Sequence, residues 1–409
     1  MQPDPRQWLL QLFQHGLVAV NGRACVHAYL AGRHFDGPLY LVALGKAADA
    51  MTAGALDAIG NQLSSGLVVT RYGHQDSAAY RDPRIVLLEA GHPLPDEESL
   101  SAGRALQLFL HEAPDNACFL FLISGGASSL AEVPAAGVTL ANLRSLGRWL
   151  LASGLPIAAV NRVRSAYSLI KGGRLLQNLA GREAEVLLIS DVPGDVPEHI
   201  GSGPLLPPLP GPFPELPEQF HSLHRQPEAQ GFDVSRVHVH LLATNQQARR
   251  LVHDAACAGS DPVHLHADLP ASRAIECGQE IARYLCGAAP GVHIWGGETV
   301  VCLPEHPGRG GRNQHLALAA ACKLVGRNDI WLLAAGTDGT DGNSSDAGAV
   351  VDGGSVARGE QAGFDAAECQ ERADAGSFLE ASGDLVYTGP TGTNVMDLVI
   401  AYKSAGRAV

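Results

Sequence analysis

Paired cysteines, basic residues and long apolar runs are scarce in this chain of 409 residues. The eight cysteines lie far apart and none forms a CxxC pair, which argues against a zinc ribbon or a redox dithiol. Isolated cysteines in a long chain are typical of buried thiols in a reducing compartment. No apolar run approaches the roughly 18 residues that a membrane span needs, so we expect no membrane partner.

Positive charge is in deficit. Lysine and arginine number 29 against 42 aspartates and glutamates, and the formal net charge is −13. Nucleic acids and anionic membranes attract proteins through basic faces, so we expect no nucleic-acid partner. Substrates that carry phosphate are not excluded, because a few local cations and backbone amides can hold them.

The overall composition is that of a globular protein. Apolar residues make up 46% of the chain and charged residues 17%, so it can bury a large core. The first 20 residues contain a single arginine and an apolar stretch broken by polar residues, which is not typical of a secretory signal peptide. We therefore expect a soluble, cytoplasmic protein.

Short apolar runs recur along the chain, each followed by glycine or small polar residues and then by a helical pattern. Among them are Leu39–Leu44, Gly66–Thr70, Cys118–Ile123, Val186–Ile189, Val292–Trp295 and Ile330–Ala335. Such runs are typical of strands buried on both faces of a parallel sheet, and their alternation with helices predicts a doubly wound α/β fold. Ligands in these folds bind beyond the carboxyl ends of strands, where this chain places its glycine, serine, lysine and aspartate clusters.

A proline-rich segment divides the chain. Residues 201–220 hold seven prolines, which cannot donate to a strand ladder, so we expect extended surface chain there. Alternating strand and helix signals resume at Val237–Leu242. We predict one domain over residues 1–232 and a second over 233–409, and leave open whether the segment after about residue 388 packs back onto the first.

The segment from Asn161 to Lys171 has the sharpest polar pattern. If it forms one helix, at about 100° per residue, two cations, an amide and a hydroxyl share a face roughly 80° wide. These residues are Asn161, Arg164, Ser168 and Lys171. Such a stripe could hold anions, and the alternative is an ordinary solvated helix surface.

A serine- and glycine-rich loop follows the apolar run Cys118–Ile123. Glycine lets backbone N–H groups approach an anion, and a following helix adds its positive end. The candidate residues for phosphate binding are Ser124, Gly125, Gly126 and Ser128. The loop matches neither a Walker A loop nor a GxGxxG fingerprint, and a tight turn that needs glycine for its geometry alone is the alternative.

Arginine also lies at a predicted helix start, where it is electrostatically unusual. Gly311 is followed by Arg312 and Asn313, ahead of the apolar run Leu316–Cys322. Cations are better placed at helix C-termini, so an arginine here suggests that an anion lies nearby. A structural turn with a surface arginine is the alternative.

Carboxylates cluster after two predicted strands. Asp338, Asp341 and Asp346 follow Ile330–Ala335, and Asp191 follows Val186–Ile189. Clustered carboxylates suit Mg²⁺ or a general base, so Asp191, Asp338 and Asp341 are the candidate metal ligands. An EF-hand alignment that starts at Asp341 fails, and turns rich in Asx residues are the alternative explanation.

Two histidine pairs alternate along predicted strands. His238 and His240 share one face, as do His264 and His266, but no third zinc ligand is evident. Ordinary strand histidines are the simpler interpretation.

Taken in their order along the chain, these motifs make the sequence resemble the glycerate 2-kinase family with a MOFRL domain. Some members of this family carry the label "putative hydroxypyruvate reductase". The resemblance spans nearly the whole chain. It rests on the motifs at Ala43–Ala48, Gly91–Asp96, Ser124–Gly126, Asn161–Arg164, Ser168–Arg174, Ser190–Asp195, Gly201–Pro204, Gly296–Thr299, Gly311–Gln314, Gly336–Gly339 and Thr388–Asn394.

The resemblance implies a fold and an activity. It implies two α/β domains, the N-terminal one Rossmann-like with a mostly parallel sheet and the C-terminal one a smaller MOFRL domain. It also implies ATP-dependent phosphorylation of D-glycerate at its 2-hydroxyl, giving 2-phosphoglycerate and ADP, in the cleft between the domains. The basic residues of the family match Lys46 and Arg312, and its acidic strand end matches Asp191.

A mechanism follows as a hypothesis. To catalyse phosphoryl transfer, a protein mainly needs to position the reactants and to neutralise the charge on the transferring phosphate. Lys46 and Arg312 would hold the transferring phosphate and the glycerate carboxylate, and which holds which stays open. Asp191 would orient or deprotonate the 2-hydroxyl or help to hold Mg²⁺.

The chain departs from the family pattern at a few positions, and two other functions stay open. The departures are Ala127, Ser165, Ala166, Leu205 and His315. An NAD(P)-dependent hydroxypyruvate reductase should carry a GxGxxG turn, and none appears in the expected place. A non-catalytic protein that binds sugar acids on the same scaffold is the second alternative, and a homo-oligomer is also left open.

Overall fold

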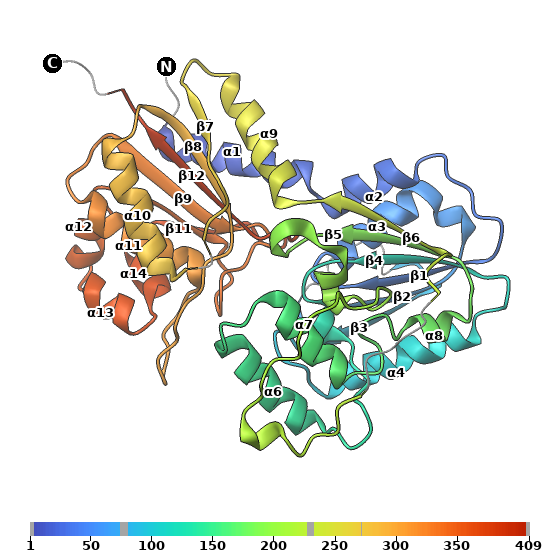
Figure 1. Cartoon of the computed structure of the whole chain (residues 1–409). Helices are drawn as coiled ribbons and strands as arrows, with labels where there is room; N and C mark the ends of the chain where they lie inside the picture. The colour runs from blue at the N-terminus through green and yellow to red at the C-terminus, as the bar shows by residue number, and fades with distance from the viewer. Residues whose placement is uncertain (1–3, 74–80, 227–232, 271, 406–409) are drawn as a thin grey trace. The chain divides into compact units, whose positions relative to one another are not determined.

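The computed structural model describes residues 4–73, 81–226, 233–270 and 272–405, which fall into two compact units. The parallel-sheet unit comprises Asn21–Thr244 and Gly392–Asn394. The mixed-sheet unit comprises Met1–Val20, Asn245–Thr391 and Val395–Val409. Each unit has its own sheet (Figure 1). Each also has its own apolar core.

Six strands form an all-parallel sheet in the parallel-sheet unit. They are β1 (Leu39–Leu44), β2 (Leu63–Arg71), β3 (Ile85–Ala90), β4 (Cys118–Ile123), β5 (Ala184–Ile189) and β6 (Val237–Ala243). Their order is β3-β2-β1-β4-β5-β6, and every neighbouring pair is parallel. This order reverses direction between β1 and β4, and the crevice beyond the carboxyl ends of two such strands is where open α/β sheets bind ligands.

Helices connect these strands. They are α2 (Gly22–Leu30), α3 (Ala48–Ile59), α4 (Glu97–Glu112), α5 (Ala127–Leu130), α6 (Leu140–Ala152), α7 (Ile157–Ala166) and α8 (Leu176–Leu179), with short 3-10 turns at η1 (Gly60–Gln62), η3 (Pro193–Asp195), η4 (Pro197–Ser202) and η5 (Glu218–Phe220). Phe119 and Phe121 of β4 are fully buried in the main core. A satellite core joins α6, α7 and the proline-rich segment, with Phe220 buried in it.

The mixed-sheet unit has six strands in the order β11-β10-β9-β12-β8-β7. They are β7 (Val263–Leu265), β8 (Gly291–Gly297), β9 (Ile330–Gly336), β10 (Gly348–Asp352), β11 (Leu385–Val386) and β12 (Asp397–Lys403). β7 and β8 are parallel, and the other neighbours are antiparallel. The two-domain α/β fold expected from the sequence is therefore confirmed, with a parallel first sheet and a mixed second sheet.

The helices of this unit are α1 (Pro5–Ala19), α9 (Asn245–Cys257), α10 (Ala274–Gly287), α11 (Arg312–Leu324), α12 (Ser355–Gln361), α13 (Ala366–Glu371) and α14 (Ala375–Ala381). Helix α11 is buried along nearly its whole length, because its run of leucines and alanines packs on the sheet and on α10. The start of α11 is the part that matters for the site described below.

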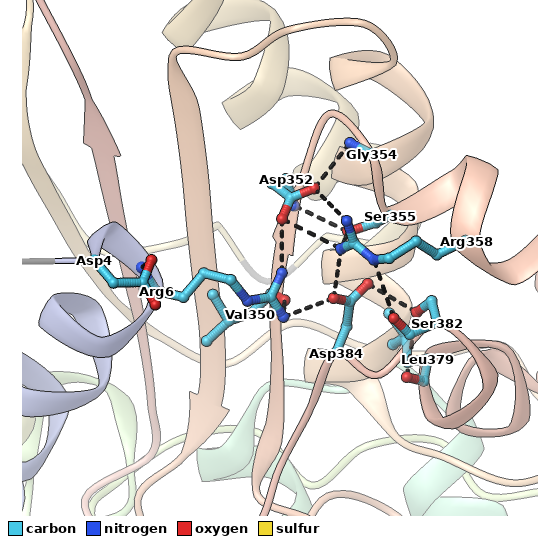
Figure 2. Close-up of polar contacts among 10 residues, drawn as sticks. All are labelled: Asp4, Arg6, Val350, Asp352, Gly354, Ser355, Arg358, Leu379, Ser382 and Asp384. Carbon is cyan, nitrogen blue, oxygen red and sulfur yellow. Dashed lines mark hydrogen bonds and ion pairs between the residues drawn. The ribbon is translucent and has the colours of Figure 1, made fainter.

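Helix α1 lies in the mixed-sheet unit although it begins the chain. Arg6 donates to Asp352 at 2.7 Å and to Asp384 at 2.6 Å, and Arg358 donates to both carboxylates from the other side (Figure 2). Trp8 adds an edge-to-face contact with Tyr402, at 4.9 Å between ring centroids. Charge pairing and aromatic packing together fix α1 to the sheet.

The division of the chain predicted at residue 232 falls at the edge of a segment outside the described residues, and it stays a prediction. Strand β6, which follows that point, belongs to the parallel sheet beside β5. Within the described parts of the chain, no helix combines the length and apolarity required to cross a bilayer.

Candidate active site

Lys46 lies at the carboxyl end of β1, where the sheet order reverses. Its backbone N–H donates to the carbonyl of Gly125 at 2.9 Å, and the next N–H, of Ala47, donates to Ser124 Oγ at 3.0 Å. The turn after β1 is therefore joined to the predicted phosphate loop after β4. The structure brings Lys46, Ser124, Gly125 and Gly126 together at the switch point of the sheet.

Gly126 lets the Lys46 side chain lie against the loop. Its backbone is left-handed, with φ +87°, a conformation that glycine adopts without strain. A Cβ atom added there would lie 3.2 Å from Lys46 Cγ and 3.1 Å from the His92 ring. The side chain of Lys46 thus packs against the loop that is the candidate phosphate site.

Gly125 allows a carboxylate to approach the same loop. Asp191 follows β5, the strand beside β4, and a Cβ at Gly125 would collide with its carboxylate and with the amide of Asn394. Asn394 Nδ2 also donates to Asp191 Oδ2 at 3.3 Å. The absence of a side chain at Gly125 is therefore what gives Asp191 its place beside the loop.

Asn161, Ser202 and Ser128 form a hydrogen-bonded chain that reaches the loop. Ser202 Oγ donates to Asn161 Oδ1 at 2.9 Å and lies 2.7 Å from Ser128 Oγ. Arg164 makes one hydrogen bond among the described residues, a long one of 3.5 Å to Asn161. Burial lowers the pKa of Arg164, and the charges of Asp191 and Glu132 partly offset this. Arg164 is thus a half-buried cation with donors to spare, facing two carboxylates.

The prediction of one continuous helix from Asn161 to Lys171 is wrong, because α7 ends at Ala166. Beyond that point the backbone pairs with another segment. Ala135 N–H donates to the Tyr167 carbonyl at 2.9 Å, and Leu169 N–H donates to the Val133 carbonyl at 2.8 Å. These tertiary hydrogen bonds replace the helical ones, which overrides the local helix propensity.

Ser168 and Lys171 nevertheless meet, because both bind Glu132. Ser168 Oγ donates to Glu132 Oε1 at 2.5 Å, and Lys171 forms an ion pair with Glu132 Oε2. Lys171 is 3% exposed and Glu132 is 5% exposed, so the charges neutralise each other inside the protein. A pocket beside this pair is lined by Ser128, Arg164 and Lys171 among others.

In the mixed-sheet unit, Arg312 opens α11 and is held by two acids. Its Nε donates to Asp397 Oδ2 at 2.5 Å, and its Nη2 reaches Asp397 Oδ1 at 3.1 Å and Glu298 Oε1 at 2.6 Å. Burial acts to lower the pKa of Arg312, but the two carboxylates outweigh it and raise the pKa well above its usual value. Asp397 and Glu298 therefore supply negative charge of the kind that the sequence predicted beside Arg312.

Asp341 caps the start of α11. Its two oxygens accept the backbone N–H groups of Asn313 at 3.1 Å and Gln314 at 2.8 Å, and Asn313 Nδ2 also donates to it at 3.3 Å. Burial, with 2% exposure, raises the pKa of Asp341 to about 7. Asp341 therefore fixes the helix start that carries Arg312 and Asn313.

Asp338 forms an Asx turn at the end of β9, where its Oδ1 accepts from Thr340 N at 3.0 Å and from Thr340 Oγ1 at 3.1 Å. Asp346 pairs with Arg309 at 2.5 Å. Across the described residues, no group of three or more histidine, cysteine, aspartate or glutamate side chains is placed to hold a metal ion.

Sequence reasoning missed four polar residues that organise these clusters. They are Glu132, Glu298, Asn394 and Asp397. Glu132 and Asp397 act on partners 39 and 85 positions away, which no local spacing reveals. Glu298 and Asn394 lie within motifs quoted for the family resemblance, and that is the signal that could have found them.

The fold and these clusters define a class. An open parallel sheet with a lysine, a glycine-rich loop and a carboxylate at the ends of its central strands is typical of α/β proteins that bind ligands at this edge of the sheet, and the lysine and the loop are groups that suit an anion. The comparison with known proteins narrows this class. Residues 8–212 match a family model described as a domain of unknown function (DUF4147), and residues 291–397 match the MOFRL family.

Several relatives are similar over most of their length. The chain is 35% identical to D-glycerate 2-kinase of Thermotoga maritima over 381 residues, covering 88% of this chain and 89% of that protein. It is 33% identical to glycerate 2-kinase of Pyrococcus horikoshii over 405 residues, or 92% and 90%. A protein of Agrobacterium vitis named "Putative hydroxypyruvate reductase" is 38% identical over 387 residues, or 88% and 98%.

A solved structure of one of these relatives has a similar fold over nearly the whole chain. The crystal structure of glycerate kinase from Thermotoga maritima superimposes with a TM-score of 0.80 at 33% identity, covering 98% of this chain and 99% of that chain. The chain belongs to the glycerate 2-kinase family, which combines the DUF4147 and MOFRL regions.

Proposed function

We propose that this protein transfers the γ-phosphate of ATP to the 2-hydroxyl of D-glycerate, giving 2-phosphoglycerate and ADP. The observation that carries the proposal is the meeting of Lys46, the Ser124–Ser128 loop and Asp191 at the carboxyl ends of β1, β4 and β5. Relatives named D-glycerate 2-kinase and glycerate 2-kinase support the choice of substrate.

The loop and Lys46 are suited to the transferring phosphate. Phosphoryl transfer needs the phosphate held in line and its developing charge neutralised. Backbone N–H groups of a glycine loop approach phosphate oxygens closely, and lysine acts as a mobile point charge beside them. In our proposal Lys46 reaches across Gly126 to the phosphate that is passed to glycerate.

Arg312 and Lys46 divide the two anionic groups of the reactants between them. Arg312 has its Nε and Nη2 atoms engaged by Asp397 and Glu298, which leaves Nη1 for a ligand. Loss of the residue that holds the carboxylate should raise KM most, whereas loss of the residue that holds the transferring phosphate should lower kcat most. Kinetics of variants at these two positions would settle the division, with Arg164 as a third cation beside the acceptor.

Asp191 is our candidate for the acceptor hydroxyl. It lies beside the loop at Gly125 and within the electrostatic reach of Arg164. An alcohol loses its proton as the new bond to phosphorus forms, so a carboxylate needs only to be within hydrogen-bond reach at that moment. Asn394 orients the Asp191 carboxylate for this task.

Mg²⁺ would enter with the nucleotide. This ion is usually held by one or two carboxylates together with substrate phosphates, a requirement that single carboxylates at the strand ends fit. We assign Asp191 and Asp338 to it in preference to Asp341, whose oxygens both accept backbone N–H groups at the α11 start. When bound, the ion would neutralise charge on the phosphate oxygens.

ADP release on mixing the protein with ATP, Mg²⁺ and D-glycerate tests the proposal. We expect ADP release that depends on D-glycerate, and no NADH oxidation with hydroxypyruvate. NADH oxidation without ADP release would instead support a reductase, the activity in the name of the Agrobacterium vitis relative. Tight binding of glycerate without turnover would support a non-catalytic protein. A cytoplasmic location and a homo-oligomeric state stay predictions.

A further inference from the structure

The mixed-sheet unit contains a pocket whose lining includes none of the residues assigned to phosphoryl transfer. Its walls are the start of α10, the segment Val300–Cys302, the first turn of α11 and helix α13, and its volume is about 270 Å³. That space accommodates a small organic molecule. Its polar lining is unusual in two independent ways.

A buried histidine forms part of this lining. His315 lies one turn into α11 and is 2% exposed, and among the described residues no polar atom within 3.5 Å hydrogen-bonds either ring nitrogen, although the backbone of Ala373 is close enough to affect the ring's charge. Burial lowers the pKa of His315, an effect that the backbone of Ala373 and the charge of Asp374 partly offset. The neutral ring has one N–H donor and one acceptor. Buried polar atoms are normally paired, so this ring is satisfied best by a ligand.

The start of α10 has no side-chain cap. Arg273 precedes the 14-residue helix, and its exposed guanidinium pairs with Glu276 of the first turn at 3.5 Å. The Ala274 N–H donates to the Val300 carbonyl at 2.9 Å, whereas the N–H groups of Ile275 and Glu276 make no hydrogen bond in the described part of the chain. Arg273 and Ile275 both line the pocket, so the positive end of the helix dipole and the guanidinium lie at this end of it.

The remaining lining decides the kind of ligand. Ile275, Val301 and Ala367 are apolar, and Glu371 is the acidic residue among the lining residues. We propose that the pocket binds a small carboxylic acid. Its carboxylate lies at the α10 start beside Arg273, its apolar body packs on Ile275 and Val301, and its inner end meets His315. Glu371 repels the carboxylate and so favours the orientation toward Arg273.

The test uses the full-length protein with its histidines labelled at 13Cε1 and followed by NMR. The probe is butanoate, and butanamide is the uncharged control of the same shape. The His315 signal is the one that is lost in His315→Gln. We expect that signal to shift saturably with butanoate, with butanamide binding at least ten times more weakly. Equal binding of the two probes, or no shift with butanoate, overturns the proposal.

Variants at the pocket sharpen the test. Arg273→Gln should weaken butanoate binding at least five-fold, and Glu371→Gln should strengthen it because a repelling charge is removed. Arg283→Gln, an exposed change later in α10, is the matched control and should leave binding unchanged. Ala367→Trp, at an exposed position of α13, should fill the pocket and abolish the shift, and it identifies the signal if His315→Gln fails to fold.

The outcome is independent of the proposed kinase activity. Arg273→Gln should leave turnover of D-glycerate unchanged, because Arg273 is not among the residues assigned to that reaction. A protein without kinase activity would still show the His315 shift. Unchanged butanoate binding in Arg273→Gln contradicts the pocket proposal and leaves the kinase proposal intact.

Discussion

Arg6 Nη2 lies 2.6 Å from Asp384 Oδ1, although 378 positions separate the two residues in the sequence. Asp384 has no exposed side-chain surface, and it also accepts from Arg358 at 2.7 Å. We expect Arg6→Met to lower the free energy of unfolding by about 1–3 kcal/mol, because it leaves a buried carboxylate short of a partner. Urea denaturation measures this loss.

The matched control is Arg23→Met. Arg23 pairs with Asp57, but both side chains are well exposed, at 54% and 39%. An exposed ion pair contributes little, so this variant should unfold at nearly the same urea concentration as the parent. Equal losses in the two variants would contradict the anchoring role of Arg6.

Replacement of Lys46 tests the phosphate site. Lys46→Met keeps an unbranched chain of similar length against Gly126 but removes the charge. We expect kcat to fall at least about 1,000-fold while the circular dichroism spectrum and the unfolding midpoint stay unchanged. Lys323→Met, an exposed change near the end of α11, is the control and should retain full activity. Near-normal turnover in Lys46→Met would refute its role.

Gly125→Ala tests whether Asp191 must lie against the loop. A methyl group at residue 125 would collide with the Asp191 carboxylate and the Asn394 amide. We expect kcat to fall at least about 100-fold, because displacement of a reacting group by about 1 Å has effects of that size. Gly287→Ala, where a Cβ meets open space, should be active. Full activity in Gly125→Ala would show that Asp191 need not contact the loop.

The buried pair of Glu132 and Lys171 gives a double-mutant cycle. Glu132→Gln leaves the Lys171 ammonium buried without its counter-charge, which should cost about 3–5 kcal/mol of stability. Lys171→Met in the same chain removes the stranded charge and should restore most of that loss. Urea unfolding of the four proteins yields the coupling energy. A simple sum of the two single effects would mean that the pair is not coupled.

Histidine burial predicts a loss of stability in acid. His293 is fully buried in β8, its Nε2 lies 3.1 Å from the Ala289 carbonyl, and burial lowers its pKa to about 4. The unfolded chain, with an ordinary histidine pKa near 6.5, binds the proton more readily between those values. The free energy of unfolding should therefore fall as pH drops from about 6.5 to about 4.

The measurement is urea unfolding at several pH values for the parent and for His293→Gln. In His293→Gln the unfolding free energy should change less steeply with pH across that window. The slope should be smaller by up to about 1.4 kcal/mol per pH unit, which is the contribution of one proton. His238→Gln, at an exposed position of β6, should keep the slope of the parent. Identical slopes in all three proteins would show that His293 is not the group responsible.

The strands were predictable because their signal is local. The apolar runs Leu39–Leu44 and Cys118–Ile123 are β1 and β4 residue for residue. A buried parallel strand is apolar on both faces, so its identity is written in consecutive residues. The clusters that follow β1, β4 and β5 were found for the same reason, since in this fold ligand-binding residues follow strands directly.

The polar clusters were only partly predictable. Ser168 and Lys171 were placed on a helix that ends at Ala166, because backbone pairing with residues 133–135 is invisible to local periodicity. The carboxylates of Glu132 and Asp397 come from distant parts of the chain. Their roles follow from the folded topology, which brings them to the cations that they neutralise.

The position of the phosphate in the product tests the central claim most directly. Proton-coupled 31P NMR of the products from ATP, Mg²⁺ and D-glycerate distinguishes the two esters by the number of hydrogens on the esterified carbon. Transfer to the 2-hydroxyl predicts a doublet for the new ester together with the signals of ADP. A triplet would place the phosphate on the 3-hydroxyl, and the absence of any new ester would contradict the kinase assignment itself.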